Sequence, residues 1–201
     1  GVSAPALSGE VAALALHLSE VAAASAEALV GAGVTHVLNA TPVAPMPACE
    51  PALTACMRVP VTDDIDSPLH HHLDAAALFI DEALKGGGRV LACCMHGSSV
   101  APAVVAYYLM RYRGMRLADA LSAIRAVAPR AYPNAGFWQR LVEAESWLRD
   151  SNGPSMTVQQ YKWQYLEQSE AGEAREQILQ RLEQGQAEVL ALLHHHSYTT
   201  V

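Results

Sequence analysis

Residues 90–102 read VLACCMHGSSVAP, and this stretch carries the most distinctive local pattern of the chain. An apolar run leads to a cysteine pair, a short loop containing Gly and Ser follows, and a helix pattern begins at about Val100. Backbone N–H groups of such a loop converge with those of the helix's first turn, where the helix dipole also favours negative charge. The stretch therefore predicts an anion-binding loop. Cys94 at its mouth is a candidate nucleophile, because the same field favours a thiolate.

The segments around this loop alternate between strand and helix patterns. Short β-branched, apolar runs predict strands at residues 34–40, 56–61 and 89–93. Longer periodic segments predict a helix that ends near residue 30 and further helices at residues 67–84, 100–112, 117–127 and 136–148. This order is typical of an α/β fold with a mainly parallel central sheet flanked by helices on both faces. Ligands of such sheets bind beyond the carboxyl ends of the strands, where the Cys94 loop lies.

The chain has 201 residues, 51% of them hydrophobic, which suffices for one well-buried core and an appendage. We place the domain at residues 1–153 and a helical C-terminal extension at residues 154–201, where Gln and Glu are frequent. The apolar side chains of this extension either pack on the domain or bind a partner. Its last residues, Thr199-Thr200-Val201, have the form of a tail that PDZ domains capture.

Composition excludes several classes of partner and site. The net charge of −7 argues against nucleic acid as a partner. The apolar segment 11–18 is too short to cross a bilayer and lacks a basic flank, so we expect no membrane association and no signal peptide. Four cysteines without metal-binding spacing indicate reduced thiols in a cytoplasmic or nuclear setting, and we expect neither metal nor cofactor. The histidine runs at 70–72 and 194–196 do not change this, because consecutive helical side chains point in different directions.

Arginines are unevenly distributed along the chain. Residues 98–140 contain six arginines and one acid, Asp119, so the local balance is +5. This segment is either ordinary solvated helix surface or a basic collar that attracts phosphorylated or acidic protein segments toward the Cys94 loop. The sequence leaves both interpretations open.

The loop and its flanking motifs resemble the cysteine-dependent dual-specificity phosphatases, particularly the small atypical members. In the family's signature, His-Cys-x-x-Gly-x-Ser-Arg-Ser, Cys94 takes the nucleophile position, Gly97 that of the loop glycine and Ser99 that of the serine before the arginine. Further matches in the family's order are residues 33–41, 59–63, 106–110 and 133–138. The likeness extends from about residue 16 to residue 148, and it implies the same α/β fold.

The resemblance also implies a mechanism and its residues. In the family, a thiolate attacks phosphorus, an aspartic acid protonates the leaving oxygen, and water hydrolyses the phosphocysteine. Cys94 takes the first role and Asp63 the second, with its neighbour Asp64 and the weaker candidate Asp66 as alternatives. The loop residues that would bind phosphate are Met95, His96, Gly97, Ser98, Ser99 and Val100. On its own, the acidic run would equally suit a solvated turn that caps a helix.

Three loop residues depart from the signature. Val100 stands where the family has the arginine that clamps phosphate, Ala101 replaces a serine, and Cys93 replaces the histidine. A guanidinium donates two parallel, charge-assisted hydrogen bonds to phosphate, whereas valine donates none. Because arginines in phosphoryl transfer can be worth roughly 10³–10⁵ in rate, we predict that hydrolysis is absent or very slow.

Two kinds of side chain could replace the missing arginine. Arg130 or Arg58 could swing over the loop, and His96 could donate when protonated, although an exposed loop histidine is the commoner case.

Three functions follow from these observations. The first is a pseudophosphatase that binds phosphorylated or acidic protein segments without efficient hydrolysis. The second is a weakly active phosphatase of Tyr and Ser/Thr phosphates that uses Cys94 and Asp63. The third is a non-catalytic scaffold that acts through its C-terminal helix.

Overall fold

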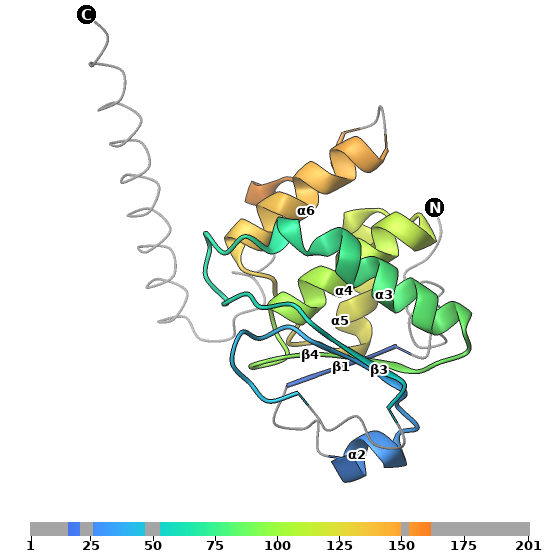
Figure 1. The fold of residues 1–201 in the computed structure, drawn as a ribbon. Helices are drawn as coiled ribbons and strands as arrows, with labels where there is room; N and C mark the ends of the chain where they lie inside the picture. Colours follow the sequence, from blue (N-terminus) through green and yellow to red (C-terminus); the bar gives the residue numbers. More distant parts are fainter. Residues whose placement is uncertain (1–15, 21–25, 47–52, 150–152, 162–201) are drawn as a thin grey trace, which may run out of the picture. The chain divides into compact units, whose positions relative to one another are not determined.

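The structure is a computed structural model, and it describes residues 16–20, 26–46, 53–149 and 153–161 (Figure 1). The chain forms two compact units, residues 1–158 and 159–201, and the fold below is that of the first. Its four parallel strands are β1 (Leu16–Glu20), β2 (His36–Asn39), β3 (Ala55–Arg58) and β4 (Val90–Cys94), in the spatial order β1-β4-β2-β3. The predicted extension, residues 154–201, lies largely outside the described residues, and the boundary at 153/154 stays a prediction.

The three strands expected from the sequence are present as β2, β3 and β4, shifted by a few residues at their ends. All residues of β4 are buried, as expected of a central strand whose sequence is continuously apolar. The structure adds β1, which the sequence analysis missed. Only Leu16 and Leu18 are apolar there, so the segment forms a strand because it pairs with β4, in a register that places Glu20 opposite Cys94.

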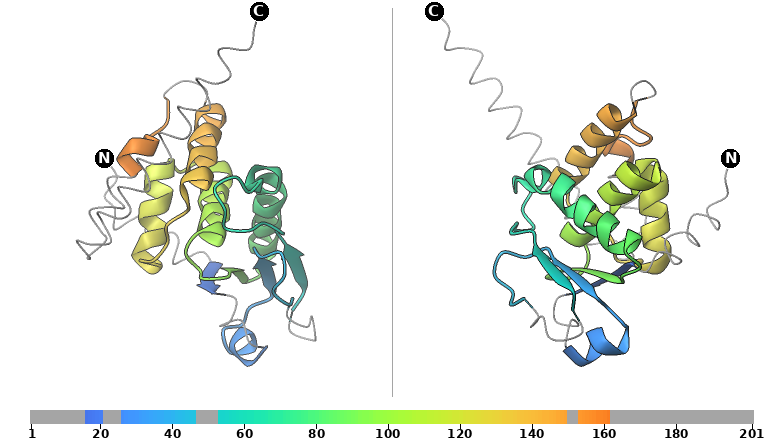
Figure 2. Two further views of the ribbon diagram at one scale, coloured as in Figure 1. Left: turned by 90° about the vertical axis from the view of Figure 1, so that its left-hand side faces the viewer. Right: turned by 45° about the vertical axis from the view of Figure 1, so that its right-hand side comes forward.

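Helices lie on both sides of the sheet, which confirms the expected α/β architecture (Figure 2). One side carries α3 (Leu73–Lys85), α4 (Val100–Arg113), α5 (Leu117–Val127) and α6 (Ala135–Leu148), and the other carries the short α2 (Ala26–Gly31). The helix expected at residues 67–84 begins later, because residues Leu69–His71 form a 3₁₀ turn, η2, before α3. None of the helices in the described residues is long and apolar enough to cross a membrane.

The centre of the core is α4, whose residues from Val100 to Met110 are all buried. A helix that is apolar on every face can be stable only when it is surrounded by other elements. Here α3, α5 and α6 pack against it, and its amino terminus abuts the end of β4. Gly114 ends the helix in the left-handed conformation, with φ of 66°. The Cys94 loop is therefore held between the most buried strand and the most buried helix.

Candidate functional site

The candidate site begins at the loop between β4 and α4. Cys94 is the last residue of β4 and Val100 is the first residue of α4, and each is only 3% exposed. Gly97 has φ of 68°, in the left-handed region that favours glycine, and this turn lets the chain reverse from strand to helix over residues 95–99. The expected sequence of strand, loop and helix is thus present, with Cys94 at the base of the loop.

The two adjacent cysteines have different surroundings. Cys93 packs in a core cluster with Leu91 and Val37 on one face of the sheet, and burial, together with the neighbouring Cys94, raises the pKa of its thiol to about 11. Successive side chains of a strand point to opposite faces, so Cys94 is directed away from this cluster. Cys93 is therefore a neutral core thiol, and Cys94 is the cysteine that faces the loop side.

Asp63, Ser99 and Asn134 form a hydrogen-bond network that joins Asp63 to the loop. Its Oδ1 accepts a hydrogen bond from the Ser99 hydroxyl at 2.5 Å and another from Asn134 Nδ2 at 2.8 Å. The Ser99 hydroxyl oxygen in turn accepts from the Asn134 backbone N–H at 3.0 Å. The Asn134 Oδ1 accepts from the Phe137 N–H, which caps the amino terminus of α6. The network therefore fixes the Asp63 carboxylate beside the loop and leaves its Oδ2 without a described bond.

The start of α6 also lies directly against the Asp63 segment. A Cβ atom on Gly136 would overlap the carbonyl group of Ile65, so this position accepts only glycine without a shift of one of the two backbones. The segment before α6 contacts the loop as well, since the Tyr132 N–H donates to the Ser98 carbonyl at 2.6 Å. Backbone contacts as well as side chains thus set the position of Asp63 relative to Cys94.

A second loop, residues 39–45, forms the opposite wall of the site. The buried Asn39 donates to the carbonyls of Ala44 and Pro45, and its Oδ1 accepts from the Thr41 hydroxyl at 2.7 Å. The Arg58 guanidinium donates to the carbonyls of Thr41 and Ala44, both at 2.8 Å. Arg58 is therefore committed to this loop, and it is not the substitute for the missing arginine that the sequence analysis considered.

A cavity of about 260 Å³ lies between these walls and the Cys94 loop. Of the residues singled out from the sequence, it brings together Cys94, Asp63, Met95, His96, Ser98 and Val100. The rest of its described lining consists of Ala40, Thr41, Pro42, Val43, Val61 and Thr62. Gly97 and Ser99 do not line it and instead shape the loop. No lysine or arginine is among the described residues that line this cavity, and its one potentially cationic side chain is His96.

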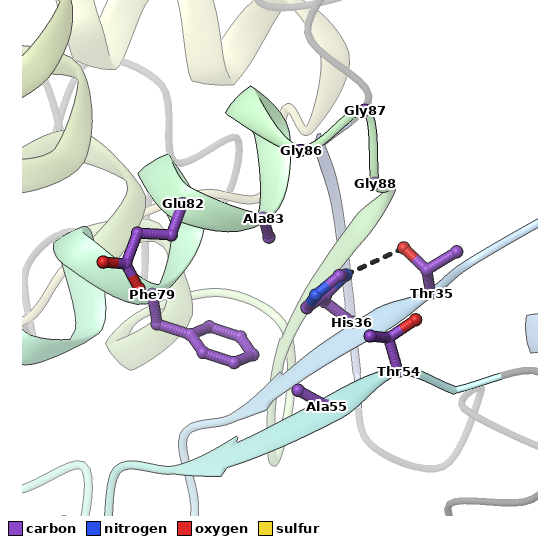
Figure 3. A pocket seen from close by; sticks show the side chains of 10 residues that line it. All are labelled: Thr35, His36, Thr54, Ala55, Phe79, Glu82, Ala83, Gly86, Gly87 and Gly88. Atoms are coloured by element: carbon purple, nitrogen blue, oxygen red, sulfur yellow. Dashed lines mark hydrogen bonds between the residues drawn. The ribbon is translucent and has the colours of Figure 1, made fainter.

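Figure 3 shows a larger cavity, of about 460 Å³, at the opposite end of the sheet. It lies between the amino ends of β2 and β3 and the carboxyl end of α3. His36 stands in it, 2.8 Å from the Thr35 hydroxyl and edge-on to the Phe79 ring. Burial lowers the pKa of His36, which keeps its imidazole neutral near pH 7. Because no cysteine is among the described residues that line this cavity, the cavity at Cys94 is the candidate catalytic site.

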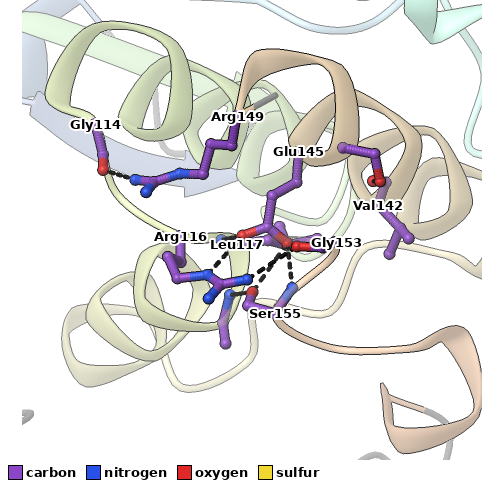
Figure 4. Close-up of polar contacts among 10 residues, drawn as sticks. Gly114, Arg116, Leu117, Val142, Glu145, Arg149, Gly153 and Ser155 are labelled. Carbon is purple, nitrogen blue, oxygen red and sulfur yellow. Dashed lines mark hydrogen bonds and ion pairs between the residues drawn. The ribbon is translucent and has the colours of Figure 1, made fainter. Parts of the chain in front are cut away.

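The arginines of residues 98–140 do not gather around the Cys94 loop. Arg111 and Arg113 lie in the last turn of α4, roughly 20 Å along the helix from the loop at its first turn. The contacts of the others are Arg116 with Glu145 (Figure 4), Arg125 with the Ala131 carbonyl and the Tyr132 ring, and Arg140 with Glu143. Arg130 is exposed and does not line the cavity. This distribution supports the interpretation as ordinary surface and structural arginines over that of a basic collar.

Comparisons with known proteins match this geometry to a family. The family described as "Dual specificity phosphatase, catalytic domain" matches residues 16–147. The chain belongs to this family. Human dual specificity phosphatase 28 is 39% identical over 128 residues, which cover 64% of this chain and 72% of that protein. The resemblance found in the sequence is thereby confirmed at the level of the family, and the matched residues include both the Cys94 loop and Asp63.

Solved structures of family members show the same fold. The crystal structure of human dual specificity phosphatase 28 superposes with a TM-score of 0.64 at 38% identity, covering 68% of this chain and 94% of that one. The crystal structure of a human protein described as tyrosine phosphatase-like serine/threonine/tyrosine-interacting protein has a TM-score of 0.60 at 27% identity. That match covers 66% of this chain and 91% of the other.

Sequence reasoning missed two residues that hold the site together. Asn134 was noted only as part of the family match over residues 133–138, and Arg58 only as a guanidinium that could move to the loop. The capping pattern of Asn134 before an apolar helix was a local signal for its contact with Phe137. Its contact with Asp63, 71 positions away in sequence, had no such signal.

Proposed function

We propose that this dual specificity phosphatase domain is a pseudophosphatase that binds phosphorylated protein segments without efficient hydrolysis. The observation that carries the proposal is the lining of the Cys94 cavity, which includes no described lysine or arginine and includes the buried Val100, the residue that the resemblance aligns with the family's arginine. Phosphoryl transfer spreads charge over three equatorial oxygens, and catalysis depends on donors matched to that charge. Backbone N–H groups at the start of α4 can still hold an anion, because they need no particular side chain.

The rate that the missing guanidinium would supply is large. Loss of one preorganised donor to a charged transition state commonly costs about 10²–10³ in rate, and phosphoryl-transfer arginines are worth up to roughly 10⁵. Neither Arg58 nor Arg130 lines the cavity to replace it, and His96 is one ring with a charge that depends on pH. The human tyrosine phosphatase-like serine/threonine/tyrosine-interacting protein, which is 27% identical to this chain, supports the same kind of function.

The second candidate is a weakly active phosphatase of Tyr and Ser/Thr phosphates. It is favoured by the state of Asp63, whose two described hydrogen bonds both reach Oδ1, so Oδ2 can carry the proton that a general acid donates. Cys94 and this carboxylate line the same cavity. This shared lining supports Asp63 as the general acid of the second candidate.

Phosphate release from a small aryl phosphate near pH 6 tests the proposal on the full chain, with Cys94→Ser, Val100→Arg and Val100→Arg/Ala101→Ser beside the wild type. We expect the wild type to match Cys94→Ser, and the double variant to gain about 10²-fold or more. Circular dichroism shows whether each variant is folded. Turnover by the wild type that Cys94→Ser abolishes would overturn the pseudophosphatase and establish the second candidate.

The partner assignments are proposals of the same rank. Of the phosphorylated or acidic segments that the sequence led us to expect as partners, we propose the phosphorylated ones for the Cys94 cavity. The PDZ-type tail Thr199-Thr200-Val201 and the scaffold function of the C-terminal helix concern residues outside the described part of the chain. Truncation after Tyr161, which keeps Ser155 and its hydrogen bonds to Glu145, separates the two: it would leave capture of a phosphorylated segment intact if the cavity binds it, and abolish capture if the extension does.

A further inference from the structure

Two exposed apolar side chains stand on the lining of the Cys94 cavity. Val43, on the loop of residues 39–45, is 78% exposed, and Met95, the first residue after Cys94, is 46% exposed. Single exposed apolar residues are common on protein surfaces and need no explanation. Here both lie at one cavity, together with the apolar residues Pro42 and Val61.

The loop that presents Val43 is braced on both sides of it. The Arg58 guanidinium donates to the carbonyls of Thr41 and Ala44, which flank Val43, and the Ala44 N–H donates back to the Thr41 hydroxyl at 3.1 Å. Asn39 and Thr41, both buried, complete the network from beneath. A loop fixed in this way has already lost its conformational entropy, so a ligand that contacts Val43 does not incur that cost.

The charge at the same cavity disfavours an acidic ligand. Asp63 lines it, and the exposed Asp64 and Asp66 follow within three positions. None of these carboxylates forms an ion pair within the described residues. Like charges repel, so glutamate or aspartate beside the bound phosphate would meet repulsion from these carboxylates, whereas the phosphate itself faces the N–H groups at the start of α4. An apolar neighbour would instead bury surface against Val43 and Met95.

From these contacts we infer that Val43 is a specificity-determining residue, and that the cavity binds a phosphorylated protein segment whose neighbouring residues are apolar rather than acidic. This inference rests on the proposed function and narrows the class of ligand. Arg58 is a positioning residue that acts through Val43, because its guanidinium holds the two carbonyls that flank it. The acidic segments expected as alternative partners are thereby disfavoured at this cavity.

The test uses the full chain and three labelled phosphotyrosine peptides that differ only in the residues flanking phosphotyrosine: leucine, serine or glutamate. Fluorescence anisotropy gives the dissociation constants for the wild type, Val43→Ala, Arg58→Ala and the control Val127→Ala. Val127, at the end of α5, is 51% exposed and does not line the cavity, so it matches Val43 as a surface valine. Because Val43 is exposed, its truncation leaves the core intact.

We expect the wild type to bind the leucine peptide about tenfold more tightly than the serine peptide, and the glutamate peptide more weakly than either. Val43→Ala and Arg58→Ala should each lower the leucine-to-serine ratio by about threefold or more without changing the glutamate-to-serine ratio, and Val127→Ala should change neither. Equal binding of the three peptides, or equal effects of Val43→Ala and Val127→Ala, would overturn this inference alone. Failure of the wild type to bind any of the three would overturn the proposed function together with it.

Discussion

Two carboxylates, one within the helix α6 and one against its amino terminus, differ in burial and in the hydrogen bonds that they accept. Glu145 lies within α6 with a side chain that is 0% exposed, and it accepts hydrogen bonds from Leu117 N–H, Arg116 Nε, and both the N–H and the hydroxyl of Ser155 (Figure 4). Asp63 lies in the loop after β3, against the amino terminus of α6. It is exposed and accepts two hydrogen bonds on one oxygen.

The difference separates a carboxylate that is saturated by structural contacts from one that is open to a ligand. A buried charge is tolerated only when donors satisfy it, and Glu145 has donors on both oxygens, so it has no capacity left for a ligand. It ties α5 and the segment of residues 153–155 to α6. Among the described residues, Asp63 accepts hydrogen bonds only on Oδ1, so its Oδ2 is available for the proton-donor role that we propose.

The largest effect is expected from removing the structural carboxylate. Glu145→Ala leaves the buried N–H groups of Leu117 and Ser155 without their acceptor, so we expect the free energy of unfolding to fall by about 3 kcal/mol. Urea unfolding measures it. Glu143→Ala, on the exposed face of α6 where Arg140 and Gln139 contact it, should cost under about 1 kcal/mol. Equal losses for the two variants would show that burial does not distinguish Glu145.

Removing the Asp63 carboxylate should lower the rate of phosphate release and leave the free energy of unfolding almost unchanged. In the Val100→Arg/Ala101→Ser background, Asp63→Asn is expected to lower the gained aryl phosphatase rate by about 10²-fold, because general acid catalysis typically contributes that much or more. Asp64→Asn, the exposed neighbour that the sequence left as an alternative acid, should leave the rate nearly unchanged. A loss confined to Asp64→Asn would move the acid role to that residue.

The position of Asp63 can also be changed without touching its side chain. Gly136→Ala places a methyl group against the Ile65 carbonyl, and the backbone shift should separate Asp63 from Ser99. In the same background we expect a rate loss of about tenfold, although alanine raises helix propensity by up to about 1 kcal/mol. Gly31→Ala at the end of α2, where a Cβ would meet nothing within 4 Å, should leave the rate unchanged. Equal rates for both variants would remove the contact with Ile65 from the account of the site.

Local patterns were enough to predict the loop and most of the fold. The apolar run of β4, the left-handed turn at Gly97 and the apolar helix α4 follow one another along the chain, so the sequence alone placed Cys94 between them. The family resemblance then added Asp63, and the structure places Asp63 and Cys94 at one cavity.

Interactions between distant segments were beyond sequence reasoning. The strand β1 exists because it pairs with β4 across more than 70 positions, although three of its own five residues are polar. Ser99 and Asn134 lie 36 and 71 positions from Asp63 in the sequence. The spacing of apolar residues along the chain carries no information about such contacts. The same holds for the arginines of residues 98–140: charge counted along the sequence does not show that Arg111 and Arg113 lie in the last turn of α4, whereas the loop precedes its first turn.

The smallest effect in this comparison is a dependence of stability on pH. Burial alone would raise the pKa of Glu145, but the hydrogen bonds from Ser155, Leu117 and Arg116 outweigh it and hold the pKa below its ordinary value of 4.5. A carboxyl whose pKa is lower in the folded state stabilises fully above its unfolded pKa, and this contribution is lost as pH falls through the folded value. Wild-type stability should therefore decline below about pH 4.5 more steeply than that of Glu145→Gln, in urea unfolding between pH 7 and 3. Curves of equal steepness for the wild type and Glu145→Gln would show that the hydrogen bonds of Glu145 do not couple its protonation to folding.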